Sequence, residues 1–128
     1  MNISIPKKFL LIGNPSDSIW VTILRNALYP LGQLDLTSES EASMCVQQKH
    51  YDLIIIDAAV FNDVEALVAA LHRQQPTIPI VVVTSSPTWQ RARRIFLAGA
   101  TDYVQKSLDT NTLLKTFQAI LAKLVSND

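Results

Sequence analysis

The sequence contains little cysteine and no excess of charge of either sign. Its single cysteine, Cys45, cannot form a disulfide within the chain, which is typical of a reducing compartment and predicts a cytoplasmic location. Lysine and arginine together number 11, as do aspartate and glutamate, so the formal net charge is zero. A neutral chain has no overall field that attracts nucleic acid or anionic lipid, and we expect neither partner for this chain alone.

Long apolar runs and glycine-rich motifs are also missing. No stretch approaches the roughly 20 apolar residues of a membrane span, and Phe9–Ile12 is too short for the core of an export signal. With three glycines in total, the chain has neither G-x-x-x-x-G-K-[ST] nor G-x-G-x-x-G. The absence of such a phosphate-cradling loop disfavours an enzyme or flavin carrier on a flavodoxin-like scaffold, which stays as the last of the alternatives.

What the sequence does contain is a regular alternation of apolar runs and amphipathic stretches. Strands are predicted at Lys7–Ile12, Gln33–Leu36, Leu53–Ile56, Ile78–Val83 and Thr101–Gln105. Helices are predicted after cap residues at Ser16 or Ser18, at Ser38 with Glu41, at Asn62 with Glu65 and at Ser86, and over Leu113–Leu124. The pattern predicts an α/β fold, a doubly wound five-stranded parallel sheet, in a single domain over residues 1–128.

Polar residues stand where these strands end. Asp57 follows the most apolar strand, Thr84 follows the next, and Lys106 follows the last. Because the carboxyl ends of parallel strands share one edge, the three side chains are expected to meet there and to suit phosphoryl transfer to the carboxylate. The alternative is that Asp57 only caps the turn that follows its strand.

The two histidines fall elsewhere. His50 precedes the strand that ends at Asp57, and His72 ends the third predicted helix, so both belong to the opposite edge of the sheet. At about 3.3 Å per residue, a strand of five or six residues separates them from Asp57 by roughly 17 to 20 Å. We therefore expect no catalytic triad and no zinc site.

The motifs LIIID, VVVTSS and AGATDYVQK resemble those of the receiver domains of two-component response regulators, over essentially the whole chain. The resemblance implies strand order 2-1-3-4-5. It also implies phosphoryl acceptance at Asp57, sensing of that group by Thr84, an ion pair from Lys106 and a rotameric switch at Tyr103. A sensor histidine kinase or another signalling protein is the implied partner, and the domain is implied to signal rather than to act as an enzyme.

The metal site of such receivers is altered here. Their first strand is usually followed by two acids that hold Mg²⁺, whereas this chain has Gly13 and Asn14. Mg²⁺ prefers several hard oxygen ligands in octahedral array, so the loss of two carboxylates predicts weak binding. Asp57, Asn14 and Asp17, the last acting through a water, are the candidate ligands. A degenerate receiver-like module that signals without phosphorylation is the main alternative function.

Two further departures flank the site. Asp57 is followed by Ala58–Phe61 in place of the family's usual Met-Pro pair and later glycine. Ser107 stands where receivers usually have a proline in a cis bond; a cis bond before serine costs roughly 2.5 to 4 kcal/mol. We therefore expect a trans bond and a displaced Lys106 amine.

The fourth predicted helix suggests a partner-binding face. Arg91 and Arg94, with Trp89 at their border and Tyr103 on the next strand, form the predicted patch, because arginines and aromatics are enriched at interface centres. It would contact acidic groups on a partner or on a second copy in a homodimer. The alternative reading is a core stripe of Trp89, Ala92, Ile95 and Phe96 beside ordinary solvated arginines; Trp20 is likewise read as core.

Overall fold

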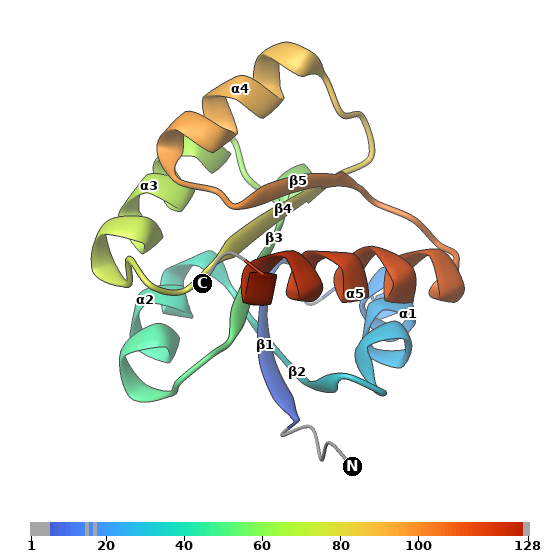
Figure 1. Ribbon diagram of the computed structural model, residues 1–128. Helices are drawn as coiled ribbons and strands as arrows, with labels where there is room; N and C mark the ends of the chain where they lie inside the picture. Colours follow the sequence, from blue (N-terminus) through green and yellow to red (C-terminus); the bar gives the residue numbers. More distant parts are fainter. Residues whose placement is uncertain (1–5, 15, 17, 127–128) are drawn as a thin grey trace.

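The computed structural model describes residues 6–14, 16 and 18–126, in which strands and helices alternate (Figure 1). The strands are β1 (Lys7–Ile12), β2 (Gly32–Thr37), β3 (Leu53–Asp57), β4 (Ile80–Thr84) and β5 (Asp102–Gln105). The helices are α1 (Ser18–Leu28), α2 (Glu39–Gln48), α3 (Val64–Gln74), α4 (Trp89–Ala98) and α5 (Thr110–Ser126). A short 3-10 helix, η1 (Ala58–Val60), follows β3 directly.

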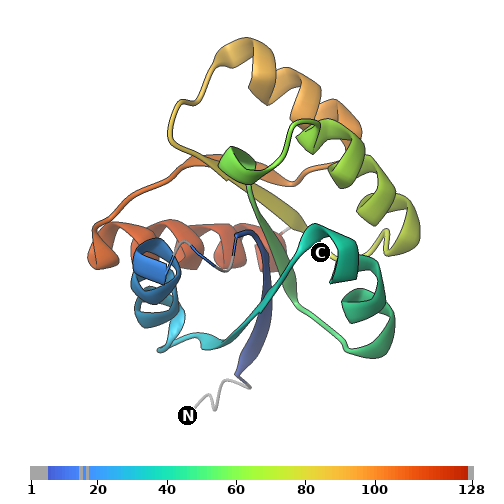
Figure 2. The ribbon, with the colours of Figure 1, turned by 180° about the vertical axis from the view of Figure 1, so that it is seen from behind.

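The five strands form one parallel sheet in the order β2-β1-β3-β4-β5. In the register of β3, Ile56 lies opposite Ile12 of β1 and Asp57 lies opposite Val83 of β4. Helices α1 and α5 cover one face of the sheet, and α2, α3 and α4 cover the other (Figures 1 and 2). The predicted fold class and strand order are confirmed.

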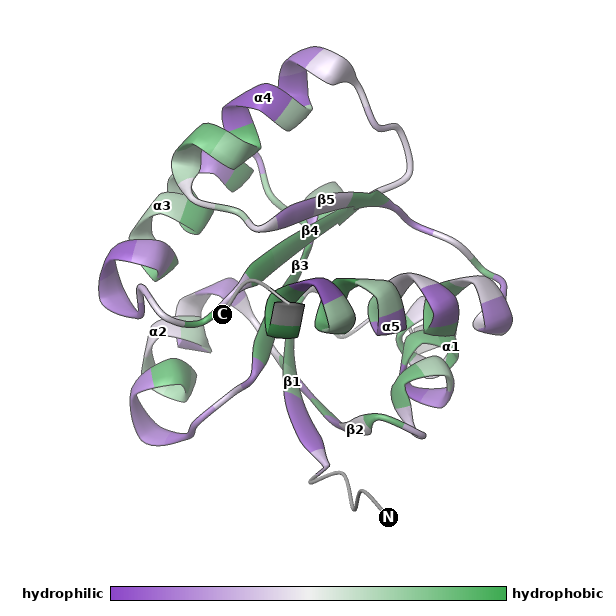
Figure 3. Cartoon of the chain, viewed as in Figure 1, coloured by the Kyte–Doolittle hydropathy of each residue, from purple (hydrophilic) through white to green (hydrophobic). Residues whose placement is uncertain are grey.

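The central strands are buried on both faces, as their unbroken apolar runs predicted. Alternate residues of β3 enter different cores: Ile54 and Ile56 pack with α2, α3 and α4, whereas Leu53 and Ile55 pack with α1 and α5. Figure 3 shows β3 and β4 as the apolar centre of the molecule. Burial of each aliphatic side chain of this size stabilises the folded state by about 1.5 to 3 kcal/mol. The central strands are therefore held firmly, and so are the positions of the residues at their carboxyl ends.

The start of α2 differs in detail from the predicted capping box. Ser38 is the N-cap, but its side chain makes no capping hydrogen bond and instead lies 3.1 Å from the Ser40 hydroxyl. A nearby hydroxyl competes with the backbone N–H for Ser38, so the pairing of Ser38 with Glu41 does not form. Ser18, one of the two predicted caps of the first helix, is the first residue of α1, and Asp17 before it lies outside the described residues.

Two other helices begin one or two residues later than predicted. Asp63, not Asn62, caps α3, and its Oδ1 accepts a backbone N–H at 3.0 Å. Thr88, not Ser86, caps α4, with an N–H to hydroxyl distance of 3.2 Å. A carboxylate at a helix N-terminus also interacts favourably with the helix dipole, which explains the choice of Asp63 over its neutral neighbour.

Helix α4 is much less buried than its sequence suggested. Of the predicted core stripe only Ile95 is buried, whereas Trp89 is 78% exposed and Phe96 is 44% exposed. The helix ends at Gly99, whose φ of 123° favours glycine and whose missing side chain leaves room for the His72 ring. The core-stripe interpretation is therefore wrong for Trp89, and a large apolar surface on α4 faces solvent.

The amino ends of the strands form the edge opposite Asp57, and both histidines lie there. His72 lines a pocket with Lys7, Asp52 and Thr101, all at or just before the starts of strands. His50 Nε2 lies 3.6 Å from the carboxylate of Asp52. The predicted placement of both histidines at the edge opposite Asp57 is confirmed.

Tyr51, just before β3, gives a pH-dependent contribution to stability. It is buried, and its hydroxyl donates to Asp35 Oδ2 at 2.7 Å. Burial, and secondly this hydrogen bond, raises the pKa of Tyr51 well above its ordinary value of 10.0. The folded state therefore retains the proton more strongly than the unfolded chain, and the resulting stability is complete below about pH 10 and is lost as the pH rises further.

We expect Tyr51→Phe to flatten the alkaline part of the stability curve. Urea unfolding from pH 8 to pH 11 should show the wild-type free energy of unfolding falling above about pH 10, with a smaller fall in the variant. Tyr29, which is exposed, provides the matched control as Tyr29→Phe. Parallel curves for wild type and Tyr51→Phe across that range would contradict the assignment.

Candidate phosphoacceptor site

The carboxyl edge of the sheet gathers the residues predicted to form the site. Asp57 is the last residue of β3, and Thr84 is the last of β4, which pairs with β3 and β5. Thr84 lies opposite Gln105, so Lys106 leaves β5 one residue beyond it. The backbone N–H of Lys106 donates to the Thr84 carbonyl at 2.7 Å, which fastens the start of this turn to β4.

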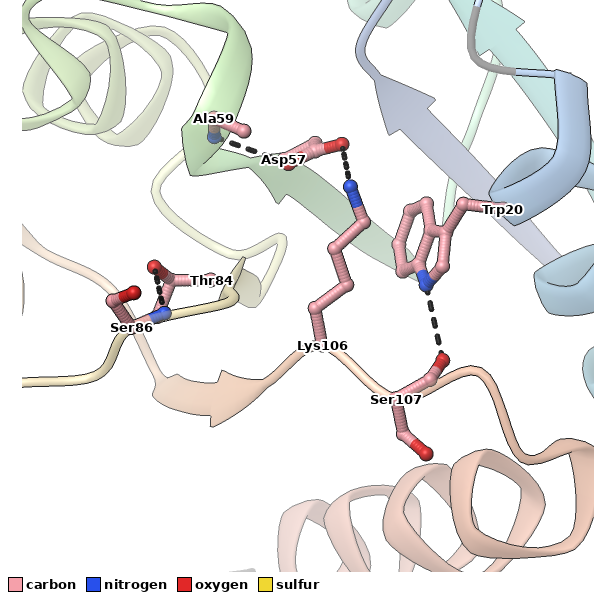
Figure 4. Close-up of polar contacts among 7 residues, drawn as sticks. All are labelled: Trp20, Asp57, Ala59, Thr84, Ser86, Lys106 and Ser107. Atoms are coloured by element: carbon pink, nitrogen blue, oxygen red, sulfur yellow. Dashed lines mark hydrogen bonds and ion pairs between the residues drawn. The ribbon is translucent and has the colours of Figure 1, made fainter.

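Asp57 and Lys106 form a buried ion pair (Figure 4). Asp57 is 2% exposed, and its Oδ2 lies 2.9 Å from Lys106 Nζ. Its Oδ1 accepts the N–H of Ala59 at 3.1 Å, so Asp57 also caps η1. The capping role weighed for this carboxylate is therefore present, but capping is not its sole contact, because the carboxylate also pairs with Lys106. A buried carboxylate needs such partners, because an unpaired charge in a low-dielectric interior is costly.

Thr84 is brought to the same edge, but its hydroxyl is engaged elsewhere. The side chain is buried, and Oγ1 accepts the N–H of Ser86 at 3.3 Å. In Figure 4 the hydroxyl is turned toward Ser86 and away from Asp57 and Lys106. Accepting uses one lone pair only, so the hydroxyl proton can still be donated to another group.

Sequence reasoning missed Trp20, which it assigned to the core alone. Trp20 is 2% exposed and packs in the core between α1 and α5, as predicted. The Lys106 ammonium also lies 4.6 Å from the centroid of its ring, and its Nε1–H donates to the Ser107 carbonyl at 3.2 Å. The sequence did contain a signal for this second role: Trp20 lies in the first turn of the helix after β1, and that turn starts at the same edge of the sheet as the site.

The turn after Lys106 is held without a proline. No peptide bond among the described residues is cis, so the bond before Ser107 is trans, as expected. The Lys106 amine nevertheless reaches Asp57, which corrects the expected displacement. The physical reason is that the Thr84 carbonyl and the Trp20 indole fix the backbone on the two sides of the Lys106–Ser107 bond.

The residues where receivers carry the acid pair are neutral. Gly13 lies beside Asp57, and a Cβ added to it would be 3.7 Å from the Asp57 Cβ. Asn14 is exposed, and its Oδ1 accepts the Ser16 N–H at 2.9 Å. Asp17 lies outside the described residues. Within the described part of the chain, no three histidine, cysteine, aspartate or glutamate side chains cluster as a metal site.

These donors do not make a complete Mg²⁺ site. Receiver domains generally bind Mg²⁺ at the site of phosphorylation. Here the described donors are one carboxylate, already paired with Lys106, and one neutral amide oxygen. Mg²⁺ is held by hard, preferably charged oxygen ligands, so this donor set supports weak binding only.

Tyr103 lies in β5 opposite Val82 and packs against the core on the α3 and α4 side. Its hydroxyl is buried and has no hydrogen-bond partner among the described residues. A buried hydroxyl without a partner costs about 1 to 3 kcal/mol.

The predicted partner patch on α4 divides between two flanks of the helix. Arg94 Nε lies 3.5 Å from Glu65 Oε2, so Arg94 faces α3. At 100° per residue, Phe96 lies about 200° around the helix from Arg94, whereas Trp89 and Arg93 lie within about 60° of Phe96. We define the α4 stripe as Trp89, Arg93 and Phe96, all of which are exposed.

Parallel strands with an acid, a hydroxyl residue and a lysine at their carboxyl ends are the arrangement of a receiver-type fold. The model of the response regulator receiver domain family matches residues 18–118, and the chain belongs to that family. It is a receiver domain of two-component signalling. Membership of this family favours signalling over the flavin-carrier alternative.

A curated relative supports the assignment to this family. The chain is 31% identical over 86 residues to the transcriptional regulatory protein ZraR of Salmonella typhimurium, a match that covers 66% of this chain and 20% of the relative. The chain thus spans about a fifth of the length of the curated relatives it matches.

Solved structures show the same fold. A response regulator from Thermotoga maritima superposes with a TM-score of 0.81 at 18% identity, covering 92% of this chain and 99% of that one. A two-component response regulator from Clostridium difficile gives a TM-score of 0.77 at 26% identity, covering 92% and 98%. None of the helices in the described ranges combines the length and the apolar character that a membrane span requires.

Proposed function

We propose that this domain accepts a phosphoryl group on Asp57. The observation that carries the proposal is the buried carboxylate held 2.9 Å from a lysine ammonium at the carboxyl edge of the sheet. No other acid among the described residues ends a buried strand beside a lysine and a threonine hydroxyl. A sensor histidine kinase is the proposed physiological donor, in the cytoplasm.

In the proposed reaction one oxygen of Asp57 attacks the phosphorus of the donor. A P–O bond to the carboxylate forms, the bond between phosphorus and the leaving group breaks, and the leaving group departs with the electron pair. Lys106 stabilises the negative charge that develops on the phosphoryl oxygens, because its ammonium already lies within hydrogen-bond distance of the carboxylate. Thr84 then donates its hydroxyl proton to a phosphoryl oxygen.

The switch follows from the same residues. Turning the Thr84 hydroxyl toward the phosphoryl group withdraws it from the Ser86 N–H, at the start of the segment that leads into α4. Tyr103, whose buried hydroxyl lacks a partner among the described residues, is the second moving part. Phosphorylation would thereby alter the surface formed by β5 and the α4 stripe.

The direct test is to incubate the protein with a small phosphodonor and Mg²⁺ and to determine its intact mass. We expect one added phosphoryl group, located on Asp57 by peptide mapping after reduction of the acyl phosphate. A protein that takes up no label from any small donor or histidine kinase would contradict the proposal and would support the second candidate.

The second candidate is a degenerate receiver that signals through protein contacts alone. The specific observation in its favour is the neutral pair Gly13 and Asn14, which leaves the described donors without a metal cluster. In this reading the Asp57–Lys106 pair is a fixed structural element. The labelling experiment separates the two candidates.

Helix α4 is proposed as the partner-binding element, with a second copy of the chain as its occupant. Trp89 and Phe96 expose apolar surface beside Arg93, and β5 next to α4 contributes Asp102, whose carboxylate pairs with Lys123 of α5. Two copies related by a twofold axis would place such opposite charges across from one another. The ZraR relative suggests that the output of such an association is transcriptional control.

We expect Trp89→Ala with Arg93→Glu to weaken self-association at least tenfold, because aromatic and arginine anchors dominate interfaces of this kind. Sedimentation velocity before and after phosphorylation, or with beryllofluoride as a phosphoryl mimic, measures the change. Arg94→Glu is the matched control, since Arg94 faces α3 and pairs with Glu65. Equal association in all three proteins would show that the α4 stripe is only solvated surface.

A further inference from the structure

Trp20 touches both the side chain and the backbone of the turn that carries the site lysine. Its ring lies under the Lys106 ammonium, 4.6 Å from centroid to Nζ, and its Nε1–H donates to the Ser107 carbonyl at 3.2 Å (Figure 4). The contact spans 87 residues of sequence. A buried indole with no polar function would not need to meet two adjacent residues of one loop.

The turn has a local support of its own, since the Ser107 hydroxyl accepts the Asp109 N–H at 3.0 Å, but the strand that leads into it is short. Strand β5 is only four residues long, and none of its residues is fully buried. The residue after Lys106 is a serine in a trans bond, so no proline ring limits the backbone. The Lys106 N–H is held by β4, and the Ser107 carbonyl is held by Trp20, so the Lys106 side chain starts from a backbone fastened on both sides.

The Trp20 ring also attracts the positive charge of the Lys106 ammonium. The face of an indole attracts a cation, and the attraction is larger when water is excluded, as it is around a tryptophan that is 2% exposed. The ammonium is thereby attracted on one side by the indole ring and on another by the Asp57 carboxylate.

We propose that Trp20 is a positioning residue for Lys106, and that it replaces the missing proline in aiming the ammonium at Asp57. Its influence on phosphoryl transfer rests on the proposed function, whereas its influence on the place of the lysine does not. The polar contacts of Trp20 are with Lys106 and Ser107, and it acts through these two residues.

Two substitutions separate the contribution of the indole ring face from that of the indole N–H. Trp20→Phe keeps an aromatic face and removes the N–H, whereas Trp20→Leu removes both. Leu24→Ala on the same helix is the matched control, since Leu24 is fully buried in the same core and its replacement lowers stability without removing an aromatic face. A purely structural role for Trp20 predicts that Trp20→Leu behaves like Leu24→Ala.

The first readout is the NMR shift of the Lys106 ε-methylene protons, which does not depend on phosphorylation. Protons held over the indole face are shifted upfield, so Trp20→Leu should move them toward the values of an exposed lysine. Trp20→Phe should keep a smaller upfield shift, and Leu24→Ala should keep all of it. Unchanged ε-proton shifts in Trp20→Leu would overturn the proposal.

The second readout is the rate of labelling by a small phosphodonor. We expect Trp20→Leu to be about tenfold slower than wild type, Trp20→Phe to be intermediate, and Leu24→Ala to be close to wild type. A folded Trp20→Leu protein that is labelled as fast as Leu24→Ala would overturn the proposal. If wild type itself takes no label, the phosphoacceptor function fails, and the ε-proton shifts alone decide the role of Trp20.

Discussion

Replacing Asp57 by asparagine is expected to abolish phosphorylation, because the amide lacks the nucleophilic oxygen pair that the buried carboxylate offers. Replacing Lys106 by alanine should slow labelling about a hundredfold or more, since a preorganised charge next to the reacting group contributes on that scale. Intact mass over a time course with a small phosphodonor measures both effects. Asp63→Asn and Lys115→Ala, which remove an acid and a cation away from the site, are the matched controls.

The same variants separate chemistry from stability. Among the described residues, Lys106→Ala leaves the buried carboxylate with only the Ala59 N–H as a hydrogen-bond partner, and breaking such a pair costs about 3 kcal/mol. Removing the charge as well, in Asp57→Asn with Lys106→Ala, should recover part of that loss. Urea unfolding of the single and double variants tests the coupling. Labelled Asp57→Asn protein, or Lys106→Ala labelled at the wild-type rate, would refute the site assignment.

The fold was predictable because the strands that build it are buried on both faces. Leu53–Ile56 and the valines of β4 are unbroken aliphatic runs, a pattern that amphipathic helices do not share. Helix starts were less predictable, since Asn62 and Asp63 are adjacent and both good caps, and they differ mainly in the charge that favours Asp63 at the helix N-terminus. The exposure of Trp89 escaped prediction because periodicity identifies an apolar stripe and not the neighbour that would cover it.

Part of the site was equally accessible from the sequence. Strand ends in a parallel sheet share an edge, and this rule alone placed Asp57 near Lys106. The direction of the Thr84 hydroxyl was not accessible, because it depends on the course of the chain through Ser86. Trp20 was not found for a related reason: its contact with Ser107 depends on how α1 lies against the turn before α5.

Restoring the acid pair should create a strong Mg²⁺ site from a weak one. The space beside Gly13 accepts a Cβ, since the nearest atoms to an added Cβ, in Asp57 and Leu11, are at van der Waals distances of 3.7 and 3.8 Å. Gly13→Asp with Asn14→Asp would therefore set new carboxylates beside Asp57, a donor set of the kind that Mg²⁺ requires. We expect the apparent affinity for Mg²⁺ to rise at least tenfold, measured by calorimetry or by metal titration of amide NMR shifts.

Stability gives an independent measure of the same change. Without metal, the added carboxylates repel Asp57 and should lower the Tm of the double variant below that of wild type. Added Mg²⁺ should reverse this loss by mass action, whereas the wild-type Tm should respond little at the same concentrations. Gly13→Asn is the matched control, because it adds a side chain of similar size without charge. Tight Mg²⁺ binding by wild type would contradict the prediction, and its loss in Asp17→Asn would identify Asp17 as the residue that restores the site.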